Sequence, residues 1–238
     1  AVTCIRPYDQ DVSLPCAFDP ERPATTLGEV LSRCGIQQFH CAETEKYAHV
    51  TYFFNGGRPD PYQGEKQLLI PSPKVSTYNL QPEMSAAEVS NSVLNAMKQQ
   101  HFGFIVVNFA NGDMVGHTAD WFATLKAVEA LDNAAADLLD AATELGYSAI
   151  LTADHGNCEE LIDTRSGGPH TQHTCNPVPC LIIDELHWQL SSQAGLSSIA
   201  PTVLQLMGIA QPGEMTGKSL LLHGQAREQQ RDAMPGAA

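Results

Sequence analysis

The chain has 238 residues, of which 43% are hydrophobic, enough for one large α/β domain or two small domains with a sizeable core. Its 13 basic and 27 acidic residues give a net charge of −14. This balance argues against nucleic acid or an anionic membrane surface as a partner, because both require clustered cations. A small anionic substrate remains compatible, since bound divalent ions reverse the local charge.

The cysteine pattern and the lack of targeting signals predict a cytoplasmic protein. The seven cysteines form no C-x-x-C pair, and their odd number favours free thiols in a reducing compartment over a disulfide framework or a zinc knuckle. No apolar run approaches the ~20 residues that span a bilayer. The first ten residues lack the charged-then-apolar order of a signal peptide.

The N-terminal stretch differs in character from the remainder. Val2 to Ile5 has the composition of a strand, and four prolines punctuate the chain between positions 7 and 23. We therefore expect a terminal strand followed by a linker. A chain that starts in mid-strand without Met is compatible with a fragment and equally with processing or trimming.

A helix, a strand and a second helix are expected next. Thr25-Thr26 offers an N-cap for a helix that Gly35 ends, and a strand follows over Ile36–Cys41. The helical pattern over Glu43–Val50 includes Lys46, and a short strand is expected at Lys66–Ile70. Lys46 could reach a phosphate from the start of its helix. The pattern alone favours an exposed lysine paired with neighbouring glutamates.

Two helices are predicted on either side of a buried strand. Ser85 to Glu88 fits a capping box, and the helix that follows has a core-facing apolar stripe. The apolar run Gly103–Val107 is typical of a strand buried on both faces of a parallel sheet. A long helix is expected from about Asp120 to Leu145. Its predicted buried stripe is Leu125, Val128, Leu131, Ala135, Leu138 and Leu139.

The last part of the chain completes an alternating pattern of strands and helices. Strands are predicted at Tyr147–Leu151 and Cys180–Ile183, and a helix ended by Gly208 precedes a tail that we expect to fray past Leu222. The alternation predicts an α/β fold with a parallel sheet between helices. Residues 103–151 are expected to form a right-handed crossover within that sheet.

Acid and imidazole side chains follow two of the predicted strands at their carboxyl ends, where open α/β sheets bind ligands. Asp113 and His117 follow the first strand, four residues apart, on a helical turn or a glycine-containing loop. Asp154 and His155 follow the second strand, before Gly156, which we expect to permit a tight turn. One such pair is more often an ordinary turn than a metal site.

A third polar cluster makes coincidence less probable. His170 and His173 precede the strand at 180–183, and either could be a ligand. Six candidates from three strand ends suggest two divalent ions, a recurring arrangement for phosphoryl transfer. The supply of ligands is nevertheless short. If Asp113, His117 and His173 hold one ion, two protein ligands remain for the other, fewer than a firm site needs.

Four motifs in order resemble the cofactor-independent (2,3-bisphosphoglycerate-independent) phosphoglycerate mutases of the alkaline phosphatase superfamily. They are ETEKYAHVTYFFNGG, NFANGDMVGH, TADHGN and HTQHTCNPVP. The resemblance covers about Thr25 to Gly217 and implies a phosphatase domain into which a transferase domain is inserted. Residues 1–20 would be the end of the inserted domain and its linker. Residues 21–238 would be the C-terminal part of the metal-binding phosphatase domain.

The resemblance also implies the activity and the roles of single residues. The family interconverts 3-phosphoglycerate and 2-phosphoglycerate in glycolysis and gluconeogenesis, through a phosphoserine and without 2,3-bisphosphoglycerate. It uses two divalent ions, which we expect to be Mn²⁺, with Mg²⁺ or Co²⁺ as alternatives. Asp113, His117 and His173 match ligands of one ion, and Asp154 and His155 match ligands of the other. Lys46 matches a lysine that contacts the transferring phosphoryl group.

The family's serine nucleophile, a further aspartate ligand and most substrate-binding arginines come from segments that this chain lacks. We therefore expect the 238 residues alone to be inactive, and the full-length protein to be a monomer that binds phosphoglycerate. Two alternatives stay open. One is another phosphomutase or phosphatase of the superfamily, and the other is an inactive metal-binding fragment that serves as a scaffold.

Overall fold

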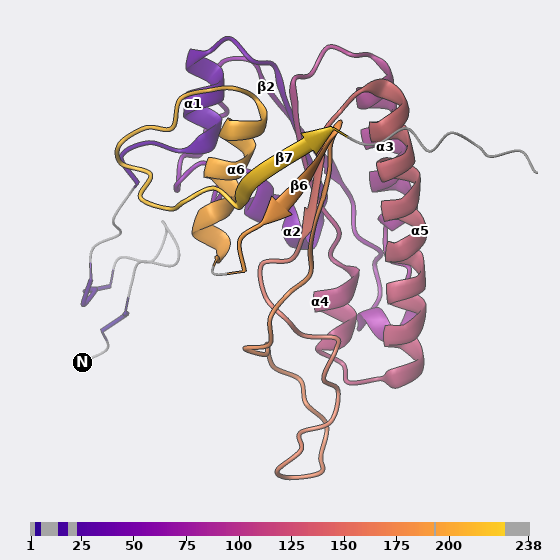
Figure 1. Cartoon of the computed structure of the whole chain (residues 1–238). Helices are drawn as coiled ribbons and strands as arrows, with labels where there is room; N and C mark the ends of the chain where they lie inside the picture. The colour runs from indigo at the N-terminus through magenta and orange to yellow at the C-terminus, as the bar shows by residue number, and fades with distance from the viewer. Residues whose placement is uncertain (1–2, 6–13, 19–22, 193, 227–238) are drawn as a thin grey trace, which may run out of the picture.

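A parallel sheet lies at the centre of the molecule. The structure is a computed structural model that describes residues 3–5, 14–18, 23–192 and 194–226. Strand β1 (Gln38–Glu43) pairs in parallel with β2 (Glu65–Ile70) on one side and with β3 (Phe104–Asn108) on the other. The described residues also form two antiparallel pairs: β4 (Ala149–Thr152) with β5 (Cys180–Ile183), and β6 (Leu186–Leu190) with β7 (Leu221–Ala226), the latter pair labelled in Figure 1.

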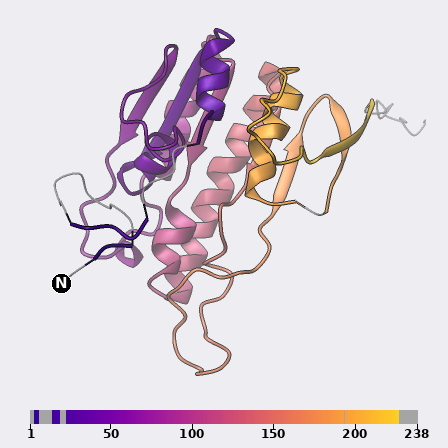
Figure 2. The same ribbon diagram turned by 90° about the vertical axis from the view of Figure 1, so that its left-hand side faces the viewer.

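Helices cover both faces of the parallel sheet (Figures 1 and 2). On one face, α3 (Ala86–Lys98) and α5 (Trp121–Leu145) pack on Phe39 and Cys41 of the central strand. On the other face, α1 (Leu27–Arg33) and α6 (Ile199–Leu206) form a second core with Phe54 and Phe104. Because neighbouring residues of a strand point to opposite faces, β1 contributes to both layers. The predicted α/β fold with a parallel sheet between helices is confirmed.

Two short helices follow the carboxyl ends of parallel strands. α2 (Thr44–Val50) begins directly after β1, and α4 (Asn111–Gly116) begins three residues after β3. Short 3₁₀ helices occur at Tyr78–Leu80 and Leu196–Ser198. Each predicted strand or helix between residues 27 and 207 has a counterpart, with bounds shifted by a few residues. Within the described ranges, no helix is long and apolar enough to cross a membrane.

The predicted crossover within one sheet is wrong. β3 pairs with β1 along one edge, β4 pairs with β5, and in the part of the chain that the structure describes these two strands do not pair with each other. Every residue of β3 is therefore only half-buried, where a fully buried strand was predicted. The cause is that β3 has a paired neighbour on one side only among the described residues, whereas an interior strand has one on each side.

The predicted buried stripe of α5 is wrong in part: Leu138 is buried as predicted, whereas other members are not. Leu125 and Val128 are 49% and 39% exposed. The buried face consists mainly of small residues, because α5 packs closely against α3 and α4. Its members are Ala123, Thr124, Ala127, Ala134, Leu138 and Ala142.

Three local predictions need correction. The capping box at Ser85 does not form, because the Ser85 hydroxyl donates instead to the Pro71 carbonyl at 2.8 Å. The tail past Leu222 does not fray at once, since β7 continues to Ala226; residues 227–238 lie outside the described part. At the N-terminus the backbones of Cys4 and Cys16 form an isolated parallel β-bridge, and the two residues are not joined by a disulfide. Val2 and most of the expected linker lie outside the described residues.

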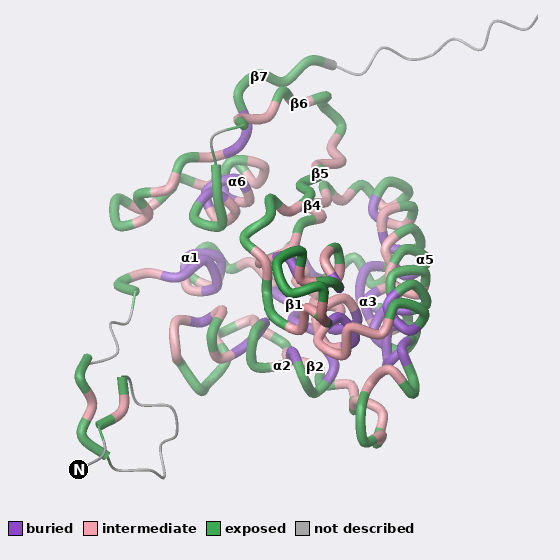
Figure 3. The backbone as a smooth tube through the Cα atoms, turned by 90° about the horizontal axis from the view of Figure 1, so that it is seen from below, coloured by how far each residue is buried: buried purple, intermediate pink, exposed green. Residues whose placement is uncertain are grey.

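Burial falls off from the parallel sheet towards β6 and β7, whose residues are mostly exposed (Figure 3).

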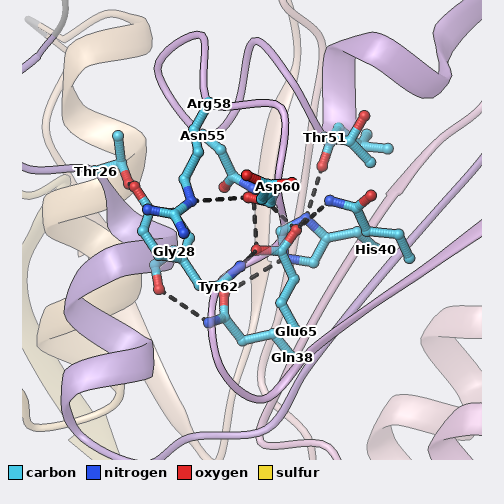
Figure 4. A network of polar contacts seen from close by, with 12 residues as sticks. Thr26, Gly28, Gln38, His40, Thr51, Asn55, Arg58, Asp60, Tyr62 and Glu65 are labelled. Carbon is cyan, nitrogen blue, oxygen red and sulfur yellow. Dashed lines mark hydrogen bonds and ion pairs between the residues drawn. The ribbon is translucent and has the colours of Figure 1, made fainter.

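A buried polar network lies beside β1 (Figure 4). The buried Glu65 carboxylate accepts hydrogen bonds from Asn55 Nδ2 at 2.9 and 3.0 Å and from the Tyr62 amide at 2.9 Å. His40 Nδ1 lies 2.7 Å from the Val50 carbonyl oxygen and donates to it. Because Val50 is the last residue of α2, this contact ties the end of that helix to β1.

Candidate metal centre

Helix α4 brings Asp113 and His117 together. The two residues are one helical turn apart, and His117 Nε2 lies 3.0 Å from Asp113 Oδ1. The sequence left open whether a helix or a loop carries this pair, and the structure shows a helix. His173 reaches the same point from the segment before β5. Its Nε2 lies 3.0 Å from Asp113 Oδ1 and 3.2 Å from His117 Nε2.

The hydrogen bonding of His117 suits metal binding. Its Nδ1 lies 2.8 Å from the Thr171 carbonyl and donates a proton to it, so the neutral ring presents a lone pair at Nε2. Metal-bound histidines commonly donate their other ring N–H to a carbonyl in this way. The ligand atoms of Asp113, His117 and His173 all lie within 4.8 Å of one another. One carboxylate and two imidazoles match the donor set of Mn²⁺, Co²⁺ or Zn²⁺.

Asp154 and His155 lie beside this trio, after β4. The His155 ring stacks on His173 with centroids 3.7 Å apart and 18° between the planes. Its Nε2 is 3.6 Å from Asp154 Oδ2, and its Nδ1 is 3.3 Å from the Gly156 carbonyl. These two side chains offer an oxygen and a nitrogen for a second ion, but a firm site needs at least one more ligand.

Gly156 serves a different purpose from the predicted tight turn. Its φ is not positive, and it makes an antiparallel bridge with Thr174. A Cβ at this position would lie 2.2 Å from both Glu159 Oε1 and Thr174 Oγ1. Glycine is therefore needed for close approach between the two ligand-bearing loops.

His170 is not one of the three converging residues. Its Nδ1 lies 3.1 Å from the Glu160 carbonyl, and its backbone amide donates to the Leu161 carbonyl at 2.9 Å. His170 thus ties its loop to residues 160–161, while His173 is the histidine beside Asp113.

Lys46 is not an exposed lysine paired with its glutamates. It is 7% exposed, and its ammonium forms an ion pair with Asp113 Oδ2. Helix α2 therefore places a cation directly against the metal-ligand cluster. The sequence pattern could not reveal this pair, because 67 residues separate the two side chains.

Asn157 is a contact that the sequence did not single out, although it ends the TADHGN motif. Its side-chain amide donates to Asp113 Oδ1 at 2.8 Å and to the Asp113 carbonyl at 3.2 Å. Burial alone would raise the pKa of Asp113. Hydrogen bonds from Lys46 and Asn157, together with the charge of Lys46, outweigh it and lower the pKa to about 2. The carboxylate is therefore ionised and available as a ligand at neutral pH.

Comparison with known proteins fits this donor set. Residues 16–211, which make up most of the chain, match the model of the metalloenzyme superfamily. The chain belongs to this superfamily. It is 50% identical over 217 residues to a 2,3-bisphosphoglycerate-independent phosphoglycerate mutase of Pseudomonas aeruginosa, and 49% identical over 219 residues to phosphoglycerate mutase 1 of Methanosarcina acetivorans. These matches cover 91% and 92% of this chain but 42% of each relative.

A solved structure supports the same assignment of fold. A phosphoglycerate mutase of Leishmania mexicana, crystallised at low cobalt concentration, superimposes with a TM-score of 0.83 at 32% identity. The match covers 92% of this chain and 44% of that protein. The fold is alkaline phosphatase-like, and the chain spans less than half the length of the relatives that it matches.

Proposed function

We propose that this chain is the metal-binding part of a cofactor-independent phosphoglycerate mutase, which interconverts 3-phosphoglycerate and 2-phosphoglycerate. The observation that carries the proposal is the convergence of Asp113, His117 and His173 beside Asp154-His155, with Lys46 against Asp113. Identity of about 50% to phosphoglycerate mutases supports it. The substrate would be a small phosphoglycerate, and the reaction belongs to glycolysis and gluconeogenesis.

The two ions would be divalent, with Mn²⁺ favoured and Mg²⁺ or Co²⁺ as alternatives. Asp113, His117 and His173 would hold one ion and Asp154 and His155 the other. When bound, such ions neutralise charge on phosphoryl oxygens and lower the pKa of a coordinated hydroxyl. The second pair would need further ligands from the part of the relatives that this chain does not match. That part would also supply the serine nucleophile.

The division of the chain follows from the same proposal. Residues 1–20 would be the end of an inserted transferase domain and its linker, and residues 21–238 would be part of the phosphatase domain. The match to the metalloenzyme superfamily begins at residue 16, close to this boundary. Among the described residues, β3 and β4 each have one edge without a paired strand, where a further strand could add to the sheet.

The chain's own residues would act by charge and position. Lys46 is held by α2 beside Asp113, so a phosphoryl group entering there would meet a cation that is already close to it. His117 is held by the Thr171 carbonyl in the tautomer that leaves Nε2 without a proton. The short supply of ligands favours one alternative, namely that the chain by itself is an inactive metal-binding unit.

The test is a chimaera in which this chain replaces the matching 42% of the Pseudomonas aeruginosa mutase. With Mn²⁺ and without 2,3-bisphosphoglycerate, we expect conversion of 3-phosphoglycerate to 2-phosphoglycerate by the chimaera and none by the 238 residues alone. Lys46→Met in the chimaera should abolish this conversion, whereas Lys66→Met, at an exposed position of β2, should not. Release of free phosphate without mutase turnover would instead indicate a phosphatase.

A further inference from the structure

The side chain of Asn157 is placed to control a single oxygen of Asp113. Asp113 Oδ1 faces His117 Nε2, His173 Nε2 and the Asn157 amide, at 3.0, 3.0 and 2.8 Å. The other oxygen, Oδ2, pairs with Lys46. The two oxygens are therefore distinguished, and the one that Asn157 holds is the one that converges with the imidazoles.

Asn157 is itself fixed from several directions. It is 4% exposed, and its backbone amide donates to Glu159 Oε2 at 2.7 Å. Glu159 also accepts from the Thr174 hydroxyl and from Asn176 Nδ2, so it ties the TADHGN loop to the loop that carries His173. The side-chain oxygen of Asn157 is buried without a hydrogen-bond partner. The side-chain hydrogen bonds of Asn157 are therefore the two that its Nδ2 donates to Asp113.

Gly116 leaves the space that Asn157 occupies. A Cβ on Gly116 would lie 2.4 Å from Asn157 Oδ1, and the Asn157 side chain would have to move. Gly112 lies one turn earlier in the same helix, and its Cβ would meet only Cys158 Sγ at an ordinary 3.6 Å. The two glycines of α4 thus differ in their relation to Asn157.

We propose that Asn157 is a positioning residue of the metal centre, which orients Asp113 Oδ1 towards the ion shared with His117 and His173. The inference rests on the proposed function, because it assumes that these residues bind a divalent ion. Outer hydrogen bonds to metal ligands commonly change metal affinity 10- to 100-fold. Asn157 would thereby join two ligand-bearing segments, since it belongs to the loop of Asp154 and His155 and contacts Asp113 of α4.

The experiment is a titration of the 238-residue chain with Co²⁺, followed by visible absorption and calorimetry. Asn157→Ala should weaken Co²⁺ binding about tenfold or more and alter the absorption bands, because Asp113 Oδ1 is no longer fixed. Asn55→Ala is the matched control. Asn55 is also a buried amide with two hydrogen bonds to a carboxylate, but that carboxylate, Glu65, lies in the network of Figure 4. The Asn55→Ala substitution should lower the stability of the chain and leave its Co²⁺ affinity and absorption spectrum unchanged.

Gly116→Ala displaces the Asn157 side chain while the asparagine remains, so it decides the question if Asn157→Ala does not fold. We expect it to weaken Co²⁺ binding as Asn157→Ala does, and Gly112→Ala to bind like the unaltered chain. Unchanged affinity and spectrum in Asn157→Ala, or in a folded Gly116→Ala, would overturn the positioning role alone. An unaltered chain that binds no Co²⁺ would overturn the metal centre itself, and the proposed function with it.

Discussion

At the scale of single residues, the ion pair of Lys46 with Asp113 is the most consequential contact. The same carboxylate is a candidate metal ligand, so the ammonium and a divalent ion compete for it in the chain alone. In the proposed mutase, a phosphoryl group would draw the ammonium away and leave Asp113 to the metal. The pair would then hold the cluster together until substrate and metal are present.

This competition predicts opposite effects of one substitution. Lys46→Met should destabilise the metal-free chain by about 1–3 kcal/mol, because the carboxylate loses its charged partner and keeps Asn157. It should also raise Co²⁺ affinity several-fold, because a competing cation is removed. Urea denaturation and calorimetric titration measure the two effects, with the exposed Lys66→Met as control. Weaker Co²⁺ binding by Lys46→Met would show that the lysine supports the site rather than competing for it.

Glu43 predicts a pH dependence of stability. Its side chain is buried at the start of α2, and this desolvation raises its pKa despite hydrogen bonds from Ser72 and Ser85. The folded state therefore keeps the proton to higher pH than the unfolded state, so stability falls as the pH rises through the interval above about 4.5.

Glu43→Gln removes this titration. The unfolding free energy of the variant minus that of the unaltered chain should therefore rise across the same pH interval and then level off. Denaturation between pH 4 and pH 8 measures the difference, and Glu129→Gln, at an exposed position of α5, is the control. A difference that does not change with pH would show that Glu43 gains as much from its hydrogen bonds as burial costs.

At the scale of elements, the sequence predicted most strands and helices and the core-facing stripe of α3, but not the buried face of α5. The segment of β3 was found because its apolar residues form a continuous run. The faces of α5 could not be assigned, since leucines and alanines both repeat at helical spacing along it. In the structure the alanines form the buried face, because α5 packs closely against α3 and α4. β6 and β7 were missed because their short, mostly exposed segments carry little pattern.

The face of α5 can be tested by enlarging one residue. Ala127 is fully buried among Met84, Ala110 and Val115, so Ala127→Leu should overpack this cluster and destabilise the chain by about 1–3 kcal/mol. Val128→Leu, at the neighbouring half-exposed position, should change stability by less than about 0.5 kcal/mol. Urea denaturation compares them. Equal effects at both positions would contradict the assignment of the buried face.

The candidate ligands could be predicted from the sequence, and their surroundings could not. Asp113 with His117 and Asp154 with His155 are close neighbours along the chain, and each pair follows the carboxyl end of a strand, where α/β folds bind ligands. The contacts of Asp113 with Lys46 and with Asn157 join residues 67 and 44 positions apart, which only the tertiary structure reveals. The same holds for the bond between His117 and the Thr171 carbonyl, which sets the tautomer.

At the scale of the whole molecule, two observations point to the same kind of incompleteness. β3 and β4 have no strand between them in the described residues, and Asp154-His155 lacks a third ligand there. The matched relatives are more than twice as long as the matched region. One added strand that carries an acidic side chain would meet both needs, which is why the proposed activity is assigned to the longer protein.

The central claim is that Asp113, His117 and His173 bind a divalent ion, and a Co²⁺ titration of three chains tests it most directly. The unaltered chain should bind one Co²⁺ tightly, with visible absorption bands typical of nitrogen and oxygen ligands. His173→Ala should lose this binding, while His170→Ala, three residues away in the same loop, should keep it. Tight binding that survives in His173→Ala, or that disappears in His170→Ala alone, would contradict the account.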